Sequence, residues 1–474
     1  MTRFRWVICA LLFFATTVNY LDRQVLSLTW DEFIKPEFHW DEVDYANITG
    51  VFAIVYALAQ LFAGRIVDKL GTKRGYLVAI GVWSAGACLH ALCGVATEWY
   101  VGVSSRMELV KATGDFAVMI STFSVYMFIF ARCVLALGEG GNFPAAIKAT
   151  AEYFPKKDRA FATATFNSGS SIGALVAPLS VPMLAAKWGW EWAFVIIGSL
   201  GFVWMGFWIW LYKKPQDNHY VNADELAYIE QDKQADMAFD TTATPQAETA
   251  QKRVSFLQFF TYRQTWAFAL GRFLTDGVWW FFLFWTPSYL NTQFGIKTSD
   301  PLGMALIFTL YLITMLSIFG GKLPAIFMER TGKDPYACRM KAMLIYAFVP
   351  LVVLLAQPLG FISPWFPVIC IGLGCAAHQS WSANMYSIGT DMFPKYASAT
   401  ITGICGMAAG CSSFIFQQVA GRLFVYSGDT NLSFLGFEGK PAGYFIIFCV
   451  CAVAYLVGWI VMKSLVPRYK LVNI

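Results

Sequence analysis

The segment Gly64-Arg65-Ile66-Val67-Asp68-Lys69-Leu70-Gly71-Thr72-Lys73-Arg74 joins two long apolar stretches, near 45–66 and 76–97. Each stretch is about 20 residues long, which is enough to cross the hydrocarbon core of a bilayer as an α-helix. Gly71 permits a tight turn between the two helices, and the Lys and Arg side chains suit a loop on the cytoplasmic side of a membrane. The segment therefore predicts a pair of membrane helices joined by a short basic loop.

The whole chain has the composition of a membrane protein. Its 474 residues are 57% hydrophobic and only 14% charged, and the mean hydropathy is +0.52. Soluble domains carry roughly 25% charged residues. The net charge of +5 is small, and no basic cluster indicates nucleic acid. None of the 11 cysteines lies in a predicted external loop and no CxxC pair occurs, so the sequence predicts neither a disulfide framework nor a metal site.

Apolar stretches of spanning length continue on both sides of the opening segment. The predicted spans are 6–28, 45–66, 76–97, 117–142, 160–184, 190–212, 264–290, 301–327, 341–361, 363–388, 396–424 and 442–464. A count of twelve places both chain ends on one side. That side and its loops hold most of the 35 Lys and Arg, whereas the first loop on the other side is acidic, so both termini are expected in the cytoplasm. No small-residue cleavage site follows the first span, which we therefore expect to be retained.

A long polar interval, 213–262, divides the chain near its middle. It predicts an N-terminal six-helix bundle at 1–212, a cytoplasmic central loop at 213–262 and a C-terminal six-helix bundle at 263–474. The string Glu152-Tyr-Phe-Pro-Lys-Lys before the fifth span is similar to Asp391-Met-Phe-Pro-Lys-Tyr before the eleventh. A parallel repeat of this kind places a substrate site between the halves, near the bilayer midplane.

Two polar stretches predict local structure outside the membrane. Asn222 and Glu225 form a predicted capping box for a surface helix at Ala223–Lys233. The small polar residues of Thr241–Ala250 then predict a flexible stretch. The amphipathic stretch Glu98–Asp115 is long for a turn between spans, and its role is left open.

Four charged residues interrupt the apolar spans: Asp22 and Arg23 in the first, and Arg132 and Glu139 in the fourth. A charge at the bilayer centre costs at least ~2.5–3.5 kcal/mol, so such residues usually line a pathway or pair with one another. Arg132 and Glu139 are two helical turns, or about 10 Å, apart, so each is expected to find its partner on the first span. Together the four groups could bind an organic anion and take up protons, or they could be ion pairs that only lock the bundle.

The spacing GxxxDKxGxKR, placed after the second of twelve predicted spans, resembles the signature loop of the major facilitator superfamily. The resemblance implies an all-α membrane protein with twelve transmembrane helices in two six-helix bundles. It also implies a conformational latch formed by Gly64, Asp68, Lys69, Gly71 and Arg74. The counterpart in the second half, 320–333, departs from the pattern because no Asp lies four residues after its glycines.

A second, longer set of residues is similar to the signature of the anion:cation symporter family, whose members carry sugar acids, phosphate, sialic acid and glutamate. It comprises Asn19-Tyr20-Leu21-Asp22-Arg23 in the first span and Gly138-Glu139, Pro144, Tyr153-Phe154-Pro155, Asp158-Arg159-Ala160, Gly169 and Gly173 further on. The resemblance implies that Asp22 and Glu139 couple protons. It implies that Arg23 and Arg132 are their partners or ligands of the anion, and that Tyr20 and Tyr56 face the substrate.

The seventh span carries RFLTDGVWWFFLFWTPSYL from Arg272 to Leu290, which is similar to bacterial hexuronate transporters except at Gly277. This narrows the expected substrate to a glucuronate- or galacturonate-like acid. Arg272 and Asp276 are four residues apart and can pair on one helix face, which could be purely structural. A sugar ring offers a face for stacking and hydroxyls for hydrogen bonds. The further predicted substrate contacts are therefore Asn167, Ser168, Asp276, Trp280, His378, Gln379, Trp381 and Asn384.

Each of these polar residues also has a structural interpretation. Polar side chains hold membrane helices together, and a lone intramembrane His such as His378 is more often a neutral hydrogen-bonding group than a proton carrier. The sequence leaves both interpretations open.

The sequence predicts a transporter rather than an enzyme, because it contains no GxSxG, HExxH or phosphate-binding GxxxxGK[ST] motif. We expect a monomeric protein of the inner (cytoplasmic) membrane, without cofactor or metal, that imports a hexuronate by proton symport with alternating access. Open alternatives are another organic anion such as an aldonate or aldarate, anion exchange, use of sodium, and a non-transporting sensor that signals through the central loop.

Overall fold

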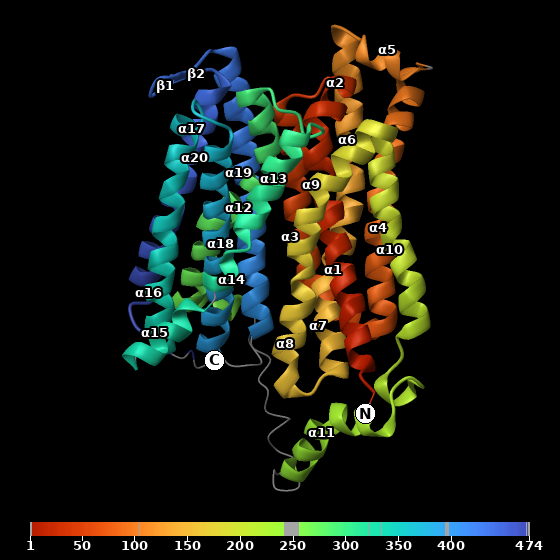
Figure 1. Ribbon diagram of the computed structural model, residues 1–474, viewed down its shortest axis with the longest axis vertical. Coiled ribbons are helices and arrows are strands. Elements are labelled where there is room, and N and C mark those ends of the chain that lie inside the picture. The colour runs from red at the N-terminus through yellow and green to blue at the C-terminus, as the bar shows by residue number, and fades with distance from the viewer. Residues whose placement is uncertain are drawn as a thin grey trace.

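The computed structural model describes residues 2–103, 105–240, 256–320, 322–332, 334–393, 398–470 and 472, and this part of the chain is almost entirely helical (Figure 1). The first half contains α1 (Phe4–Thr29), the π-helix η1 (Trp30–Ile34), α2 (Lys35–Phe38), α3 (Glu42–Leu70), α4 (Thr72–Val101), α5 (Arg106–Val110), α6 (Asp115–Glu139), α7 (Asn142–Tyr153), α8 (Lys156–Asn167), α9 (Gly169–Trp188) and α10 (Trp190–Leu211). The expected flexible stretch at Thr241–Ala250 lies outside the described residues.

The remaining elements begin with the short 3-10 helix η2 (Pro215–Asp217) and the polar helix α11 (Ala223–Asp240). They continue with η3 (Phe256–Thr261), α12 (Arg263–Phe294), α13 (Pro301–Thr314), α14 (Ser317–Gly320), α15 (Leu323–Thr331), α16 (Pro335–Phe348), η4 (Val349–Leu355), α17 (Ala356–Leu359), α18 (Trp365–Met392), α19 (Ser398–Asp429), the strands β1 (Ser433–Phe434) and β2 (Phe437–Glu438), and α20 (Lys440–Leu465).

Ten helical segments of the described residues are long and apolar enough to cross a membrane. The helices α18 and α19 are not among the ten, although they have 28 and 32 residues and pack against α13 and α12. In their described residues the spans predicted from the sequence fall on helix, and several are interrupted: the fourth at Gly140 and Gly141, the fifth at Ser168, and the eighth and ninth into shorter pieces. The protein is thus an all-helical, multi-pass membrane protein.

The helices form two groups that meet along a long seam (Figure 1). In the first group α4 packs against α6 and α10, and α1 against α9; in the second, α12 packs against α19 and α20. The seam is formed mainly by α3 against α19, with further contacts of α9 with α13 and of α1 with α12. One face of each of α1, α3 and α12 therefore borders the seam.

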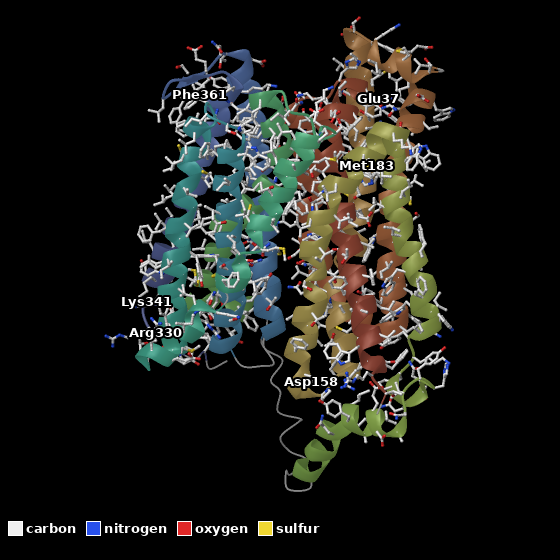
Figure 2. The ribbon with its side chains drawn as sticks, in the orientation of Figure 1. Glu37, Asp158, Met183, Arg330, Lys341 and Phe361 are labelled. Carbon is white, nitrogen blue, oxygen red and sulfur yellow. The ribbon has the colours of Figure 1, made fainter. Side chains whose placement is uncertain are left out.

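Figure 1 also defines two ends of the bundle. The start of α1 lies with α11 at one end, which we name the α11 end. At the other end, the α5 end, lie α2, α5 and the hairpin of β1 and β2. Figure 2 shows the same polarity in side chains, with Glu37 near the α5 end and Asp158 beside α11, where its carboxylate accepts a hydrogen bond from the Tyr228 hydroxyl at 2.7 Å.

The helix α11 is attached to the start of α1 through the buried carboxylate of Glu225. That carboxylate accepts hydrogen bonds from the Thr2 hydroxyl (2.6 Å), from the backbone N–H groups of Phe4 (3.0 Å) and Arg5 (3.1 Å), and from the Arg5 guanidinium (3.1 Å). Burial raises the pKa of Glu225, but these hydrogen bonds outweigh it and lower the pKa below its ordinary value.

The expected capping box at the start of α11 is only half formed. The Asn222 side chain accepts the backbone N–H of Glu225 at 2.9 Å, as predicted. The Glu225 side chain, however, points toward α1. The backbone N–H of Asn222 donates to the Thr2 hydroxyl oxygen instead, at 3.1 Å. The reciprocal bond was displaced because the free N–H groups at the start of α1 compete for the same carboxylate.

Candidate functional site

A buried ion pair between α1 and α6 lies at the centre of the site. The terminal nitrogen NH2 of Arg23 lies 2.5 Å from Oε2 of Glu139, and Nε lies 3.0 Å from the same oxygen. The two residues are only 3% and 1% exposed. The expectation that Glu139 finds its partner on the first span is confirmed.

A close approach of α4 and α6 sets the depth of this pair. A Cβ atom added to Gly138 would lie 2.2 Å from the backbone N of Trp83 and 2.7 Å from the backbone O of Ala79. Small residues allow membrane helices to pack backbone against backbone. Because Glu139 follows Gly138, its carboxylate is held beside α1 rather than at the lipid-facing surface.

Aromatic rings enclose the Arg23 guanidinium on several sides. Its Cζ lies 5.0 Å from the centre of the Tyr20 ring, 4.7 Å from Tyr56 and 5.1 Å from Trp280. Cation–π contacts of this kind contribute about 2 kcal/mol when desolvated. Trp280 belongs to α12, so both helical groups contribute to the enclosure. The Tyr56 hydroxyl accepts a hydrogen bond from Gln60 at 2.9 Å, which agrees with the predicted common face of these two residues.

Arg132 also finds its partner on the first span, but that partner is a backbone oxygen, and no ion pair with Asp22 is formed among the described residues. Asp22 instead accepts a hydrogen bond from the Trp83 indole at 3.1 Å. Within the part of the chain that the structure describes, Arg132 donates only to the backbone O of Arg23, at 3.4 Å, and it stacks on Phe52. Adjacent residues on a helix point about 100° apart, so Asp22 faces α4 when Arg23 faces α6.

Arg132 therefore remains a buried cation with spare donors. It is 1% exposed, and neither its Nε nor its NH1 nitrogen has a hydrogen-bond partner among the described residues. A buried guanidinium left in this state is strongly disfavoured unless an anion or water reaches it. The arrangement suits a carboxylate, which can accept two parallel N–H bonds from one guanidinium.

The second predicted pair, on α12, is formed. Arg272 NH2 lies 2.7 Å from Asp276 Oδ2, as their spacing predicts. The same guanidinium donates to the Ser382 hydroxyl at 2.7 Å and to the Tyr386 hydroxyl at 3.0 Å. The pair is thus fixed to α18 and lies within the second helical group.

The other polar residues predicted in the second half do not reach the Arg23 enclosure in the described contacts. His378 bonds to the Tyr455 hydroxyl at 2.8 Å and stacks on Trp279, and Trp381 lies against Tyr455 as well, so both face the interior of their own group. Asn384 donates to the backbone O of Ser380 at 2.8 Å. Gln379 is half-buried, and no described contact joins it to the enclosure.

Asn167 and Ser168 occupy the junction of α8 and α9, where both are exposed. The hydroxyl of Ser168 donates to the backbone O of Thr165 at 2.7 Å, and the backbone O of Asn167 accepts from Ser170 at 2.7 Å. These bonds stabilise the helix break, and no described contact joins either residue to Arg23.

The predicted latch lies between α3 and α4. Gly71 has φ +78°, a value that favours glycine, and it ends α3 and begins α4. Gly64 lies on α3 with open space beside it, and Lys69 and Arg74 are exposed. The side chain of Asp68 lies outside the described residues, so its role stays a prediction. Thr72, just after the turn, donates to Glu152 of α7 at 2.5 Å.

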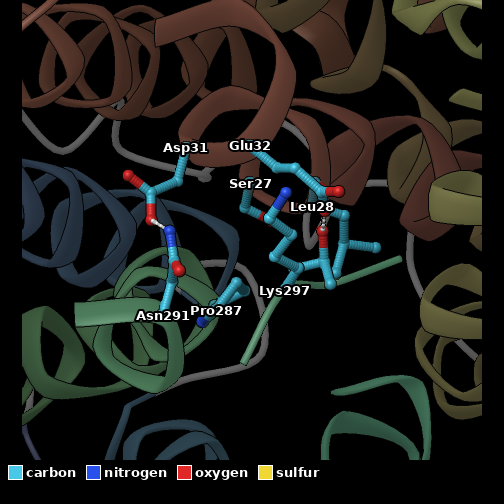
Figure 3. Close-up of a pocket in the computed structure, with 8 residues that line it drawn as sticks. Ser27, Leu28, Asp31, Glu32, Pro287, Asn291 and Lys297 are labelled. Atoms are coloured by element: carbon cyan, nitrogen blue, oxygen red, sulfur yellow. Dashed lines mark hydrogen bonds between the residues drawn. The ribbon is translucent and has the colours of Figure 1, made fainter. Parts of the chain in front are cut away.

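The acidic stretch after the first span, expected as a loop, is helical and joins the two groups at the α5 end. Figure 3 shows Asp31 accepting a hydrogen bond from Asn291 of α12, at 2.8 Å. Glu32 accepts from the Thr298 hydroxyl at 3.1 Å. Glu42 on α3 pairs with Lys440 of α20 at 2.5 Å. The described contacts thus hold the seam together at this end.

Several residues of the site escaped prediction. Trp83 and Phe52 are two among 81 aromatic residues, which make up 17% of the chain, and neither stands out in the sequence. Ser382 and Tyr386 could have been suspected only from their four-residue spacing on one helix face. In the sequence, Glu152 is distinguished only by its place in the repeated string before the fifth span.

The sequence of the chain also matches a known protein family. The sequence profile of the Major Facilitator Superfamily matches residues 12–417. The chain belongs to this superfamily. The family consists of membrane transporters, so the protein is a multi-pass transporter and not an enzyme.

Two relatives are similar to this chain over most of its length. The chain is 28% identical over 473 residues to the hexuronate transporter of Escherichia coli (strain K12), covering 99% of this chain and 96% of the relative. It is 28% identical over 367 residues to the galacturonate transporter of Dickeya chrysanthemi, covering 77% and 94%. Among solved structures, a D-xylose-proton symporter superposes with a TM-score of 0.67 at 14% identity, covering 99% and 100%, which supports the fold alone.

Proposed function

We propose that this transporter imports a hexuronate together with protons. The observation that carries the proposal is the buried Arg132 guanidinium with spare donors, next to the Arg23–Glu139 ion pair. The names of the two relatives favour a sugar acid as the cargo. The aromatic rings of Tyr20, Tyr56 and Trp280 suit the apolar face of a pyranose ring, and the two guanidiniums suit its carboxylate.

Proton uptake by Glu139 is the first step of the proposed cycle. A proton on the Glu139 carboxylate neutralises it and removes the attraction that holds Arg23. Leaving Arg23 buried without a counter-ion is strongly unfavourable. A substrate carboxylate therefore takes the place of Glu139 beside Arg23 and Arg132, and the occupied site regains its charge balance.

Asp22 is proposed as the second proton acceptor. It is buried, no described cation lies within ion-pair distance, and the side-chain hydrogen bond that it accepts among the described residues comes from the Trp83 indole. A carboxylate with so little support takes up a proton readily. Because Asp22 faces α4 and not the enclosure, its proton affects the site through the adjacent backbone of Arg23.

Transport follows when the two halves, 1–212 and 263–474, rock about the site while the loop 213–262 links them. We propose twelve membrane spans with both termini in the cytoplasm, and a monomeric protein in the inner membrane. A neutralised, substrate-filled site passes through the occluded state at lower energy than an unpaired charge would. On the cytoplasmic side the higher pH removes the protons, Glu139 reforms its pair with Arg23, and the substrate leaves.

The test is uptake of labelled glucuronate into proteoliposomes with and without an inward proton gradient. We expect accumulation that collapses when a protonophore is added. The variant Glu139→Gln should lose gradient-driven accumulation and keep counterflow of glucuronate, because a permanently neutral side chain cannot take up and release a proton.

A matched control is Glu37→Gln, which neutralises another buried carboxylate of the same half, paired with Arg106 at 2.5 Å. It should retain accumulation. Full accumulation by Glu139→Gln would refute the role of Glu139. Exchange without accumulation by the unchanged protein would refute proton symport, and competition by aldonates or aldarates stronger than by hexuronates would refute the proposed cargo.

A further inference from the structure

A second buried guanidinium, Arg272 on α12, has features that a structural ion pair does not require. It is 7% exposed, and its Nε has no hydrogen-bond partner among the described residues. Its terminal nitrogens are shared among Asp276, Ser382 and Tyr386. Only one of these three acceptors carries a formal charge at neutral pH, so the cation is opposed by one carboxylate that a ligand's carboxylate could replace.

Arg272 lines a pocket between α12, α18 and α19. The other residues that line it are Phe268, Met385, Tyr386, Ile401, Thr402 and Cys405. The Tyr386 ring lies over the guanidinium at 4.5 Å and is itself 45% exposed, so the pocket is open beside the cation. Apolar walls beside a ring hydroxyl and one guanidinium offer the chemistry that binds the carboxylate of an organic anion.

The pocket lies on the α11 side of the central site. Trp280 contacts Arg23, and Arg272 precedes Trp280 by eight residues, which is about 12 Å along the helix axis. The other end of α12 is at the α5 end, where Asn291 bonds to Asp31. A hexuronate has one carboxylate, which cannot contact Arg23 and Arg272 at the same time across such a distance. The substrate would therefore occupy the two places in turn.

Polar groups connect the two places along the seam. The Tyr56 ring, beside Arg23, carries the hydroxyl to which Gln60 donates. A Cβ atom added to Gly406 on α19 would lie 3.4 Å from the Gln60 Oε1 atom. Gly406 follows Cys405, which lines the Arg272 pocket. The seam therefore brings the amide of Gln60 between the central site and the pocket.

We propose that Arg272 forms a second carboxylate site for the transported sugar acid, on the α11 side of the central site, with Asp276 as its internal competitor. The inference rests on the proposed function and on the proposed cytoplasmic position of the α11 end. An anion arriving from the α11 end exchanges with Asp276 for the Arg272 nitrogens before it moves on to Arg23. No covalent bond changes, because the substrate carboxylate replaces Asp276 as the anion that faces the Arg272 nitrogens.

The test compares the KM for labelled glucuronate in right-side-out membrane vesicles, where it arrives from the α5 end, and in inside-out vesicles, where it arrives from the α11 end. The double variant Arg272→Gln/Asp276→Asn removes the cation without leaving an unpaired charge. We expect its KM from the α11 end to rise about tenfold, as loss of one charge-assisted contact predicts, and its KM from the α5 end to stay unchanged. Asp276→Asn alone frees Arg272 and should lower the KM from the α11 end by about tenfold.

Two further variants keep the test decisive. Ser382→Ala leaves the ion pair intact and frees one Arg272 N–H, so it should lower the KM from the α11 end even if Asp276→Asn does not fold. Arg5→Gln/Glu225→Gln neutralises a comparable pair, at 3.1 Å, outside the path and should change neither KM. Equal KM changes in both vesicle types, or none, would refute the second site and leave the proposed function standing. Absence of glucuronate transport by the unchanged protein in both vesicle types would refute the proposed function and the second site with it.

Discussion

Replacement of Trp83 by Phe tests whether Asp22 carries a proton. The indole N–H of Trp83 donates to Asp22 Oδ2 at 3.1 Å, and no described cation pairs with that carboxylate. A hydrogen bond to a charged group contributes about 1.5–3 kcal/mol and one to a neutral group about 0.5–1.5 kcal/mol. The variant Trp83→Phe should therefore disfavour the ionised form of Asp22 by about 1–1.5 kcal/mol relative to the protonated form.

This difference corresponds to about one pH unit, since 1.36 kcal/mol equals one unit. The sign follows from which form loses its partner. Because the charged form is weakened, Asp22 stays protonated to higher pH, and the midpoint of the pH profile for glucuronate uptake should move to more alkaline pH. The assay is the initial rate of uptake into proteoliposomes over a series of external pH values.

The matched control is Trp204→Phe. Trp204 is a buried residue of the same half whose indole donates to the backbone O of Leu11 at 2.7 Å, so the same substitution removes a hydrogen bond without touching a carboxylate. It should lower the amount of folded protein by a similar degree and leave the pH midpoint in place. An unchanged midpoint in Trp83→Phe, or an equal shift in both variants, would refute the role given to Asp22.

Two further predictions concern packing and the attachment of α11. Gly138→Ala should destabilise the protein by about 1–3 kcal/mol or more, because the added Cβ would meet the backbone of Trp83. Gly206→Ala is the control and should be neutral, because the space beside Gly206 is open. Equal melting temperatures of the two variants in detergent would contradict this prediction. Glu225→Gln should speed hydrogen exchange at the start of α1 about tenfold or more, because bonds to a charged acceptor are lost. In the unchanged protein the same protection is present above the ordinary carboxyl pKa of about 4.3 and is lost as the pH falls through the lowered pKa of folded Glu225; equal exchange across that range would contradict it.

The sequence by itself was sufficient for features that depend on neighbouring residues. The apolar stretches fall on helix because burial in lipid requires every backbone group to be bonded within its own segment. The Arg272–Asp276 pair follows from a four-residue spacing on one helix. The turn at Gly71, with φ +78°, follows from the freedom of glycine at a helix junction. The four intramembrane charges also marked the site without any knowledge of its geometry.

The tertiary structure decided which of these groups meet. Arg23 pairs with Glu139, whereas Asp22 bonds to Trp83 and Arg132 keeps spare donors. That outcome depends on the rotation of α1 about its axis and on the close approach at Gly138, neither of which a local pattern encodes. For the same reason His378 turned toward its own helical group. A helix has a fixed periodicity along the chain, but its rotation and depth are set by the helices packed around it, so partner choice is a property of the whole fold.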